Sequence, residues 1–429
     1  MKVLGIITEY NPLHNGHQIH LKKSLAKSNA DATICIMSGS FLQRGTPAIV
    51  NQWARTKMAL KLGIDLVIQL PISYSIRSAE HFAAGSIKLL DASNLVDSIC
   101  FGSEAGTIEP LQFLGNLLAD EPPQLSQLIQ QYLTTGISYP GARAKAIIDY
   151  LKHQETDLNF SHQELATILN SSNNILGLEY IKALSNLNSS ITPLTIKRSG
   201  ANYNSNQLQK ISSATAIRNQ IKSNQQQSST LIAQQLKQTM PQATIEILQT
   251  EFAADRGPIF PTDFGSQLLT ILRRISTTDL QQYEDINGGL ENRIKSAAQK
   301  TTSWSDLIDK IKTKRFTRTR IQRILAHVLL DLKKTDLESF DQAGGPLYFR
   351  ILGFNQPGKE LLHQIKTRGD LPLISKVANH FKSDYQPQNL LQKMLSYDLQ
   401  ANNIYNLATK SKENKRGNID YRQQPILDL

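Results

Sequence analysis

Two histidines near the start of the chain, His14 and His17, have the residue type and spacing of side chains that bind phosphate groups. They flank Gly16 and follow the apolar run from Val3 to Ile7, which we expect to be a strand leading into a helix that begins near Asn15. The N–H groups and positive dipole end of such a helix attract phosphate, and glycine lets the backbone approach it. Both imidazoles can donate hydrogen bonds as charge builds on a phosphorus, and losing one such donor typically costs about 3 kcal/mol. We therefore predict a phosphate site in which His14 and His17 are catalytic.

A second segment, residues 211–218, has the composition of a helix start that binds the far end of a triphosphate. Ser213 and Thr215 carry hydroxyls of the kind that cap helix N-termini, and Arg218 follows about one turn later. The exposed N–H groups can hold a pyrophosphate whose charge Arg218 neutralises. An ordinary helix cap with a solvated arginine is the alternative, and the presence of His14 and His17 in the same chain favours the phosphate site.

The elements that must position these segments are predicted by short apolar runs in the first hundred residues. Runs without polar alternation, separated by helical patterns, are typical of parallel strands buried on both faces. The runs are residues 3–7, 32–37, 66–70 and 98–101, with helical patterns at 53–62 and 79–90 and a further possible strand at 191–197. The pattern predicts an α/β fold with a Rossmann-like, doubly wound parallel sheet, whose carboxyl edge is where ligands bind.

Helical patterns prevail in the second half of the chain, for example at 264–275 and 317–332. Residues 219–240 are rich in Gln and Ser and suggest a boundary between two units. We therefore expect an ATP-binding catalytic domain at 1–222 and a mainly α-helical, basic domain at 223–429.

Composition favours a polyanionic partner, nucleic acid before membrane. The 429 residues carry a formal net charge of +11. No run approaches the roughly 18 apolar residues that a membrane span needs, and no signal-peptide pattern is present, so we expect a cytoplasmic protein. The two cysteines, Cys35 and Cys100, lie in apolar runs and are expected to be core residues, and no Cys/His group has zinc spacing.

Longer stretches of sequence resemble a particular family. The pattern His-x-Gly-His after a strand is typical of the nucleotidylyltransferase superfamily, and the whole segment Gly5–His17 resembles the bacterial tRNA(Met) cytidine acetate ligases. The resemblance extends over essentially the whole chain. It includes residues 37–45, 101–104, 172–180, 313–320 and 350–354.

The resemblance implies a two-step reaction with defined substrates. Acetate attacks the α-phosphorus of ATP to give acetyl-adenylate and pyrophosphate, and the acetyl group then passes to N4 of the wobble cytidine of elongator tRNA(Met). The ATP contacts that it implies are Ile7, Thr8, Glu9, Tyr10, Asn11, Pro12, Leu13, His14, Asn15, Gly16, His17, Gln18, Ile19, His20, Gly102, Asn173 and Arg198. Mg²⁺ is expected with the phosphates, and Glu9 and Glu104 are candidate ligands, although no pattern selects them. No partner protein is implied.

A basic cluster in the second half is the predicted tRNA contact. Within a segment that also contains Lys310 and Lys312, the predicted tRNA-binding residues are Lys314, Arg315, Arg318, Arg320 and Arg323. If a helix starts at Thr317, an apolar stripe that includes Ile321 and Leu325 lies opposite Arg320, Arg323 and His327, which suits an RNA backbone. A solvated basic face is the alternative. Arg44, Arg55 and Arg77 are further candidates that no spacing selects.

Two other functions remain open. A small-molecule nucleotidylyltransferase would share the phosphate motifs but would not need a long basic helical half. A non-catalytic RNA-binding protein on the same fold is disfavoured by the intact His14, Gly16, His17 and Arg218.

Overall fold

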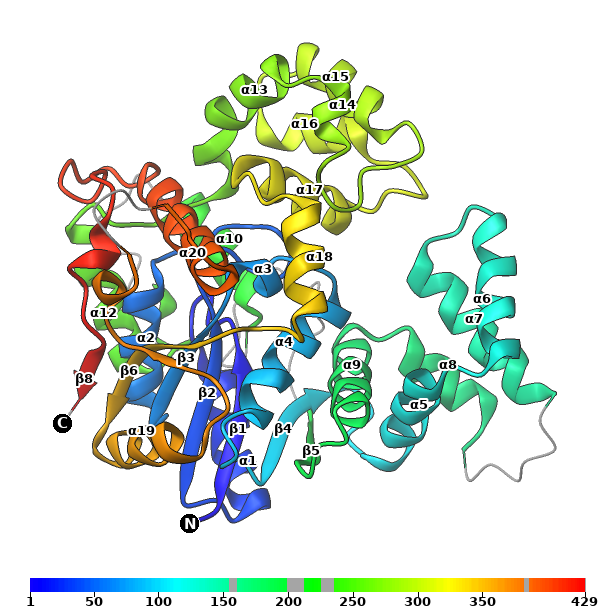
Figure 1. Ribbon diagram of the computed structural model, residues 1–429, viewed down its shortest axis with the longest axis horizontal. Helices are drawn as coiled ribbons and strands as arrows, with labels where there is room; N and C mark the ends of the chain where they lie inside the picture. Colours follow the sequence, from blue (N-terminus) through cyan, green and yellow to red (C-terminus); the bar gives the residue numbers. More distant parts are fainter. Residues whose placement is uncertain (154–159, 199–211, 225–234, 382–385, 429) are drawn as a thin grey trace.

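One eight-stranded sheet forms the centre of the protein (Figure 1). The structure, a computed structural model, describes residues 1–153, 160–198, 212–224, 235–381 and 386–428. The strand order is β5-β4-β1-β2-β3-β6-β7, and β8 pairs with β6. The parallel strands are β1 (Val3–Thr8), β2 (Ala32–Ser38), β3 (Leu66–Leu70), β4 (Ser98–Ser103) and β5 (Thr192–Lys197).

Helices cover both faces of the sheet because alternate strand residues point to opposite sides and are apolar on both. Leu4 and Cys35 belong to one core, and Val3 and Ile34 belong to the other. The core that contains Leu4 is shared with α1 (Asn15–Ser28), α2 (Gln52–Leu62), α10 (Ala214–Ser223) and α12 (Gln242–Ala253). The core that contains Val3 is shared with α3 (Ile72–Ser75), α4 (Ala79–Asp91), α5 (Glu109–Asp120), α9 (Ser172–Asn186), α18 (Lys334–Gln342), α19 (Gln356–Arg368) and α20 (Leu390–Asn406).

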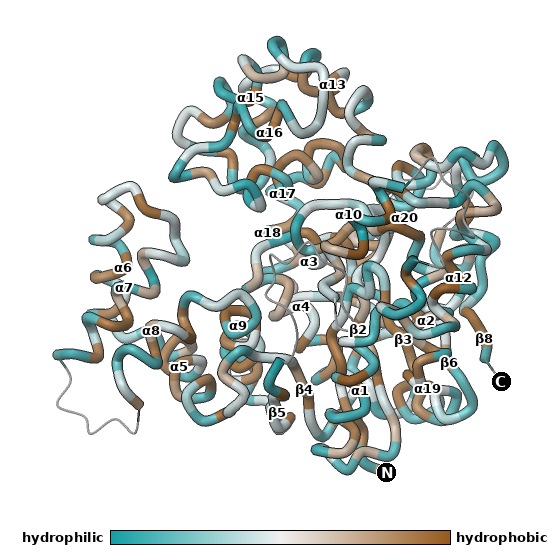
Figure 2. The backbone as a smooth tube through the Cα atoms, turned by 180° about the vertical axis from the view of Figure 1, so that it is seen from behind, coloured by the Kyte–Doolittle hydropathy of each residue, from teal (hydrophilic) through white to brown (hydrophobic). Residues whose placement is uncertain are grey.

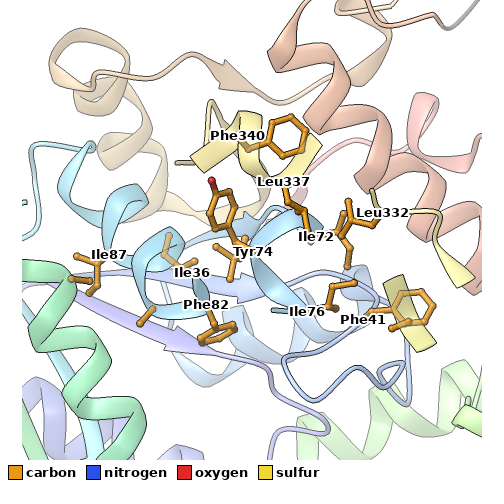
Figure 3. Close-up of a cluster of buried hydrophobic side chains, with 14 of the residues drawn as sticks. Ile36, Phe41, Ile72, Tyr74, Ile76, Phe82, Ile87, Leu332, Leu337 and Phe340 are labelled. Atoms are coloured by element: carbon orange, nitrogen blue, oxygen red, sulfur yellow. The ribbon is translucent and has the colours of Figure 1, made fainter. Parts of the chain in front are cut away.

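Figure 3 shows how the second of these cores joins distant parts of the chain. Ile36 from β2 and Phe82 from α4 share this cluster with Leu337 and Phe340 from α18. All four side chains are at most 3% exposed, so α18 belongs to the same hydrophobic core as β2 and α4.

Two groups of helices extend away from the sheet (Figures 1 and 2). The first, which we term the α6–α7 hairpin, comprises α6 (Pro123–Thr134) and α7 (Tyr139–Lys152), followed by α8 (His162–Leu169). The second, which we term the helical module, spans residues 261–332. It contains η1 (Pro261–Phe264), α13 (Gly265–Arg274), α14 (Thr277–Leu280), α15 (Leu290–Gln299), α16 (Trp304–Ile311) and α17 (Arg318–Leu329).

The predicted doubly wound α/β sheet is confirmed, including the strand expected near 191–197. Cys35 and Cys100 are buried, unpaired thiols in β2 and β4, as expected. No helix in the described part of the chain is long and apolar enough to cross a membrane.

The second half differs from the expected helical unit, because residues beyond the helical module return to the sheet. β6 (Phe349–Asn355) runs antiparallel to β3, and β7 (Leu373–Ile374) and β8 (Ile426–Asp428) pair parallel with β6. Phe349 and Leu352 enter the cores on opposite faces, so β6 is a central strand. The sheet therefore takes strands from both sides of the boundary expected at 222/223, although the residues after it are mainly α-helical, as expected. Residues 225–234 beside this boundary lie outside the described part, and the division into two domains stays a prediction.

Candidate active site

The loop between β1 and α1 is held by buried side chains from elsewhere in the chain. The guanidinium of Arg55, which is fully buried, donates from Nη1 to the carbonyls of Glu9 (2.7 Å) and Ser38 (3.0 Å) and from Nη2 to that of Gly39. Burial lowers the pKa of Arg55 to about 10, which still leaves it charged at neutral pH. Asn11 Oδ1 accepts a hydrogen bond from the N–H of Ile49 at 2.8 Å. Arg55 is therefore a structural residue of the site, and the idea that it contacts nucleic acid is wrong.

His14 and His17 form the cap of α1. The N–H of Gly16 donates to Nδ1 of His14, and the N–H of His14 donates to Nδ1 of His17, each at 3.1 Å. The two rings stack with centroids 3.8 Å apart, and Tyr10 packs edge-on against His17. Because both Nδ1 atoms accept, each neutral ring must carry its proton on Nε2. Each ring thus has an Nε2–H donor that no described residue engages.

These imidazoles are held in the neutral form. Burial, followed by the nearby charges of Arg198 and Arg218, lowers the pKa of His14 to about 4. Burial lowers the pKa of His17 well below its usual value, with His14, His20 and Arg198 adding to the effect. Burial and Arg198 lower the pKa of His20 to about 4. Two arginines beside neutral imidazoles make this corner of the sheet suited to an anion.

The second predicted motif lies against the first. α10 begins after Ser213, whose hydroxyl accepts from the N–H of Ala216 at 3.1 Å. Arg218 Nη1 donates to the carbonyl of Asn11 at 2.7 Å, and Nη2 donates to Thr215 Oγ1 at 3.1 Å. The guanidinium therefore spans the β1–α1 loop and the start of α10. Ile211, the first residue of the motif, lies outside the described part.

Gly102 and Arg198 lie together where β4 and β5 end. The N–H of Arg198 donates to the carbonyl of Ser103 at 2.9 Å. A Cβ at Gly102 would lie 3.2 Å from Arg198 Cγ, so glycine leaves space for this side chain beside α1. Since Arg198 also acts on the pKa of His14, His17 and His20, these predicted positions share one site.

Asn173 and Glu104 are joined at the start of α9. Glu104 Oε1 accepts from Asn173 Nδ2 at 2.6 Å, and Oε2 accepts from the N–H of Asn174 at 2.9 Å. Asn174 Oδ1 in turn accepts from the N–H of Glu104 at 2.8 Å. Glu9 Oε1 accepts from the N–H of Gln43 at 2.8 Å. Both candidate metal ligands thus have protein partners, and the described residues contain no group of three or more His, Cys, Asp or Glu suited to a metal ion.

Sequence reasoning missed a contact from residues 235–241. The N–H of Asn15 donates to the carbonyl of Thr239 at 3.0 Å, and its Nδ2 donates to that of Gln238 at 2.8 Å. No motif marks this segment, so only the fold shows that it supports the start of α1.

The basic cluster divides into exposed and partly buried side chains. Lys314, Arg315 and Arg318 are exposed, and Arg318 pairs with Asp309 at 2.7 Å. Arg320 and Arg323 are partly buried, and Arg320 donates to the carbonyl of Asp285 at 2.8 Å. A Cβ at Gly45 would clash with the backbone N of Arg323 at 2.4 Å, so α17 packs directly on the loop that follows β2.

His327, expected on the cationic face of the helix, and Arg77, a further candidate for contact with nucleic acid, are both buried instead. His327 is 2% exposed and its Nε2 lies 3.1 Å from the carbonyl of Ile76, so it faces the core side of α17 and not solvent. Arg77 is buried between Glu284 and Asp341, with ion-pair distances of 2.6 and 2.9 Å. Both are structural residues that connect α3 and the following loop to later helices, whereas Arg44 is exposed.

Known proteins resemble this chain over its full length. The model of the HIGH Nucleotidyl Transferase family matches residues 1–420. The tRNA(Met) cytidine acetate ligase of Acetivibrio thermocellus is 42% identical over 428 residues and 100% of both chains, and that of Halothermothrix orenii is 43% identical over 98% of both.

Solved structures agree with this relationship. The crystal structure of Thermotoga maritima TmcAL bound with alpha-thio ATP has a TM-score of 0.91 and 33% identity, covering 100% of this chain and 99% of that one. The apo form of the same protein gives the same values. The chain therefore belongs to the HIGH nucleotidyl transferase family and, within it, to the tRNA(Met) cytidine acetate ligases.

Proposed function

We propose that this protein is an ATP-dependent ligase that activates acetate and transfers the acetyl group to tRNA(Met). The observation that carries the proposal is the paired cap of α1, in which His14 and His17 each present an Nε2–H donor beside Arg198 and Arg218. Relatives at about 40% identity bear the name of this activity, and a solved structural neighbour holds an ATP analogue.

In the first step an acetate oxygen attacks the α-phosphorus of ATP. The bond between the α-phosphorus and the bridging oxygen breaks, and pyrophosphate leaves with the electron pair. His14 and His17 donate from Nε2 to the phosphate oxygens, where fixed donors matter most as charge builds. Arg218 and the start of α10, with Ser213 and Thr215, hold the pyrophosphate end. No covalent enzyme intermediate is required.

The remaining walls of the site suit the nucleoside and the α-phosphate. Arg198 supplies a second cation beside the histidines, and Gly102 exposes backbone on which the adenosine lies. Asn173 contributes an amide whose carbonyl oxygen is an acceptor while its amino group is held by Glu104. Other ATP contacts come from the segment Ile7 to His20.

In the second step N4 of the wobble cytidine attacks the carbonyl carbon of acetyl-adenylate. AMP leaves, N4 loses one proton, and N4-acetylcytidine is the product. The target base must leave its stack to reach the adenylate. The backbone at Arg323 in α17 packs on Gly45 in the loop after β2. We infer that the basic cluster at Lys314, Arg315, Arg318, Arg320 and Arg323 binds the tRNA backbone.

Magnesium fits this scheme as an ion carried by the triphosphate. The carboxylates of Glu9 and Glu104 are engaged by protein donors, so we propose that the phosphates and water supply most of the ligands. The ion would neutralise phosphate charge during the first step. We also propose that the protein acts in the cytoplasm, where tRNA is modified.

The function is tested with purified protein in two assays. Labelled pyrophosphate should exchange into ATP only when acetate is present, and tRNA(Met) incubated with ATP and labelled acetate should gain one acetyl group at the wobble cytidine by mass spectrometry. A matched tRNA with uridine at that position is the control. Exchange that does not depend on acetate would refute acetate activation, and exchange without tRNA labelling would refute the acceptor.

A further inference from the structure

A cavity of about 450 Å³ lies between the α6–α7 hairpin and the helical module. The turn from Leu133 to Tyr139 forms one wall, and Asn287, Arg315 and Arg320 form the other. Figure 1 shows the helical module above the sheet and the α6–α7 hairpin on the right, and residues of both line the cavity. The volume lies in the range of roughly 300–1,000 Å³ that is typical of small-molecule pockets. None of the predicted ATP contacts lines it.

The hairpin wall offers an exposed aromatic surface. Tyr139, the first residue of α7, is 45% exposed, whereas most large hydrophobic side chains among the described residues are not exposed. The guanidinium of Arg143 lies 5.9 Å from the ring centroid, which supports the ring from within the same helix. A ring held in this way can stack against a planar base.

The opposite wall offers cations and an amide. Arg315 is exposed and forms no ion pair with any described residue; its guanidinium packs 5.5 Å from the centroid of Phe316 and about 3.5 Å from where a Cβ of Gly288 would be. Arg320 Nε is buried and has no described partner, although its Nη2 donates to the carbonyl of Asp285. Among the described residues, Asp285 is the one acid that forms an ion pair with either arginine, 3.6 Å from Arg320 Nη2.

We propose that this cavity binds one unstacked nucleotide of the tRNA anticodon loop, a nucleotide other than the cytidine that is acetylated. Single-stranded RNA is recognised by stacking on aromatic rings and arginine planes and by hydrogen bonds to base edges. Tyr139 supplies the stacking surface, Arg315 and Arg320 bind the phosphate, and the Asn287 amide reads the base edge. The reacting base must lie at the adenylate, so the nucleotide in this cavity is a neighbour that holds the loop in place.

This inference rests on the proposed function, which makes tRNA the acceptor, and adds to it a contact from the first half of the chain. The basic cluster alone would place the RNA on one helical face. The cavity instead places RNA across two helical groups, so the α6–α7 hairpin becomes part of the recognition surface.

The test compares tRNA binding of four variants with the wild type. Tyr139→Ala and Arg315→Ala should each weaken binding of unmodified tRNA(Met) by about tenfold, measured by fluorescence anisotropy, since a stacked base or a phosphate contact is lost. Tyr139→Phe keeps the ring and should bind within about twofold of the wild type. Arg368→Ala removes an exposed arginine at the end of α19 that does not line the cavity, and should leave tRNA binding unchanged. Thermal melting confirms that each variant is folded.

Photocrosslinking identifies the occupant. A benzophenone side chain placed at position 139 should crosslink to one nucleotide of the anticodon loop. Wild-type tRNA affinity in both alanine variants, or crosslinks only outside the anticodon loop, would overturn the proposal. Failure of the proposed function gives a different result, because wild-type protein would then show no acetate-dependent pyrophosphate exchange whatever happens at Tyr139.

Discussion

The backbone N–H of His14 donates to Nδ1 of His17, so the start of α1 fixes which nitrogen of the His17 ring carries the proton. The same device acts on His14 through the N–H of Gly16. A helix cap, which ordinarily contributes stability alone, here also sets the tautomers of two histidines, so that each carries its proton on Nε2.

Substitutions of His17 should separate its contribution to the exchange reaction from its contribution to stability. His17→Ala removes both the cap acceptor and the distal donor, so acetate-dependent exchange should fall about a hundredfold and stability by about 1 kcal/mol. His17→Asn keeps an acceptor for the His14 N–H but has no donor at the position of Nε2, so exchange should fall equally while the melting temperature stays closer to that of the wild type. His363→Ala, an exposed histidine on α19, is the control. A near-wild-type rate for His17→Asn would remove His17 from the chemistry.

Arg218 should affect binding of ATP more than the fold. Arg218→Ala leaves the carbonyl of Asn11 without its 2.7 Å partner and removes a cation from the proposed pyrophosphate site, so kcat/KM for ATP should fall by about ten- to a hundredfold. Arg218→Lys restores the charge but not the fork, and should recover only part of the loss. Steady-state exchange kinetics measure both. Equal values for the lysine variant and the wild type would show that charge alone suffices.

Acid should destabilise the protein partly through His327. Burial lowers its folded pKa to about 4, against about 6.5 in the unfolded chain, so the unfolded state binds more protons as the pH falls below 6.5. The stability contributed by the neutral ring is present above pH 6.5 and is lost as the pH falls toward 4, by about 2 kcal/mol at pH 5.

Urea unfolding at pH 7 and pH 5 measures this loss. His327→Gln keeps a donor for the carbonyl of Ile76 but does not titrate, so its stability should fall by about 2 kcal/mol less than the wild type between the two pH values. His363→Gln should fall as the wild type does. An identical pH dependence in His327→Gln would show that other groups account for the acid sensitivity.

We expect the ion pairs of Arg77 to contribute to the free energy of unfolding by holding the segment after α3 against later helices. Its guanidinium is 3% exposed and pairs with Glu284 of the helical module and Asp341 of α18. Arg77→Met leaves two carboxylates without their cation, so unfolding free energy should fall by about 3 kcal/mol. Arg368→Met on the exposed face of α19 should change it by less than about 0.5 kcal/mol. A loss that small at Arg77 would contradict the structural role.

Sequence patterns predicted the strands and helices that depend on residues close together in the sequence. The strands from β1 to β4 follow from short apolar runs, and α1 follows from its position after the first of them. The pattern does not predict β6 as a strand, because Arg350 interrupts its apolar run. Its guanidinium is buried against Asp420, a partner 70 residues away that no pattern reveals.

Contacts within the site were predictable only in part. The type and spacing of His14 and His17 sufficed to place them together, because one helix turn separates them. The approach of Arg218 to Asn11 and of Arg198 to Gly102 joins residues that are far apart in sequence, and it depends on how β4, β5 and α10 pack. Helical periodicity placed His327 on the outer face, but the fold covers that position with the segment around Ile76.

The antiparallel strand β6 constrains the order in which the chain can fold during synthesis. Until residues 349–355 leave the ribosome, β3 is a hydrophobic edge strand whose backbone hydrogen-bonding groups have no partner on one side. Such an edge strand can pair with strands of other chains. A nascent chain synthesised only as far as the helical module therefore exposes the unpaired edge of β3, which β6 covers in the complete fold. Truncated products that end before β6 are expected to aggregate or to bind chaperones.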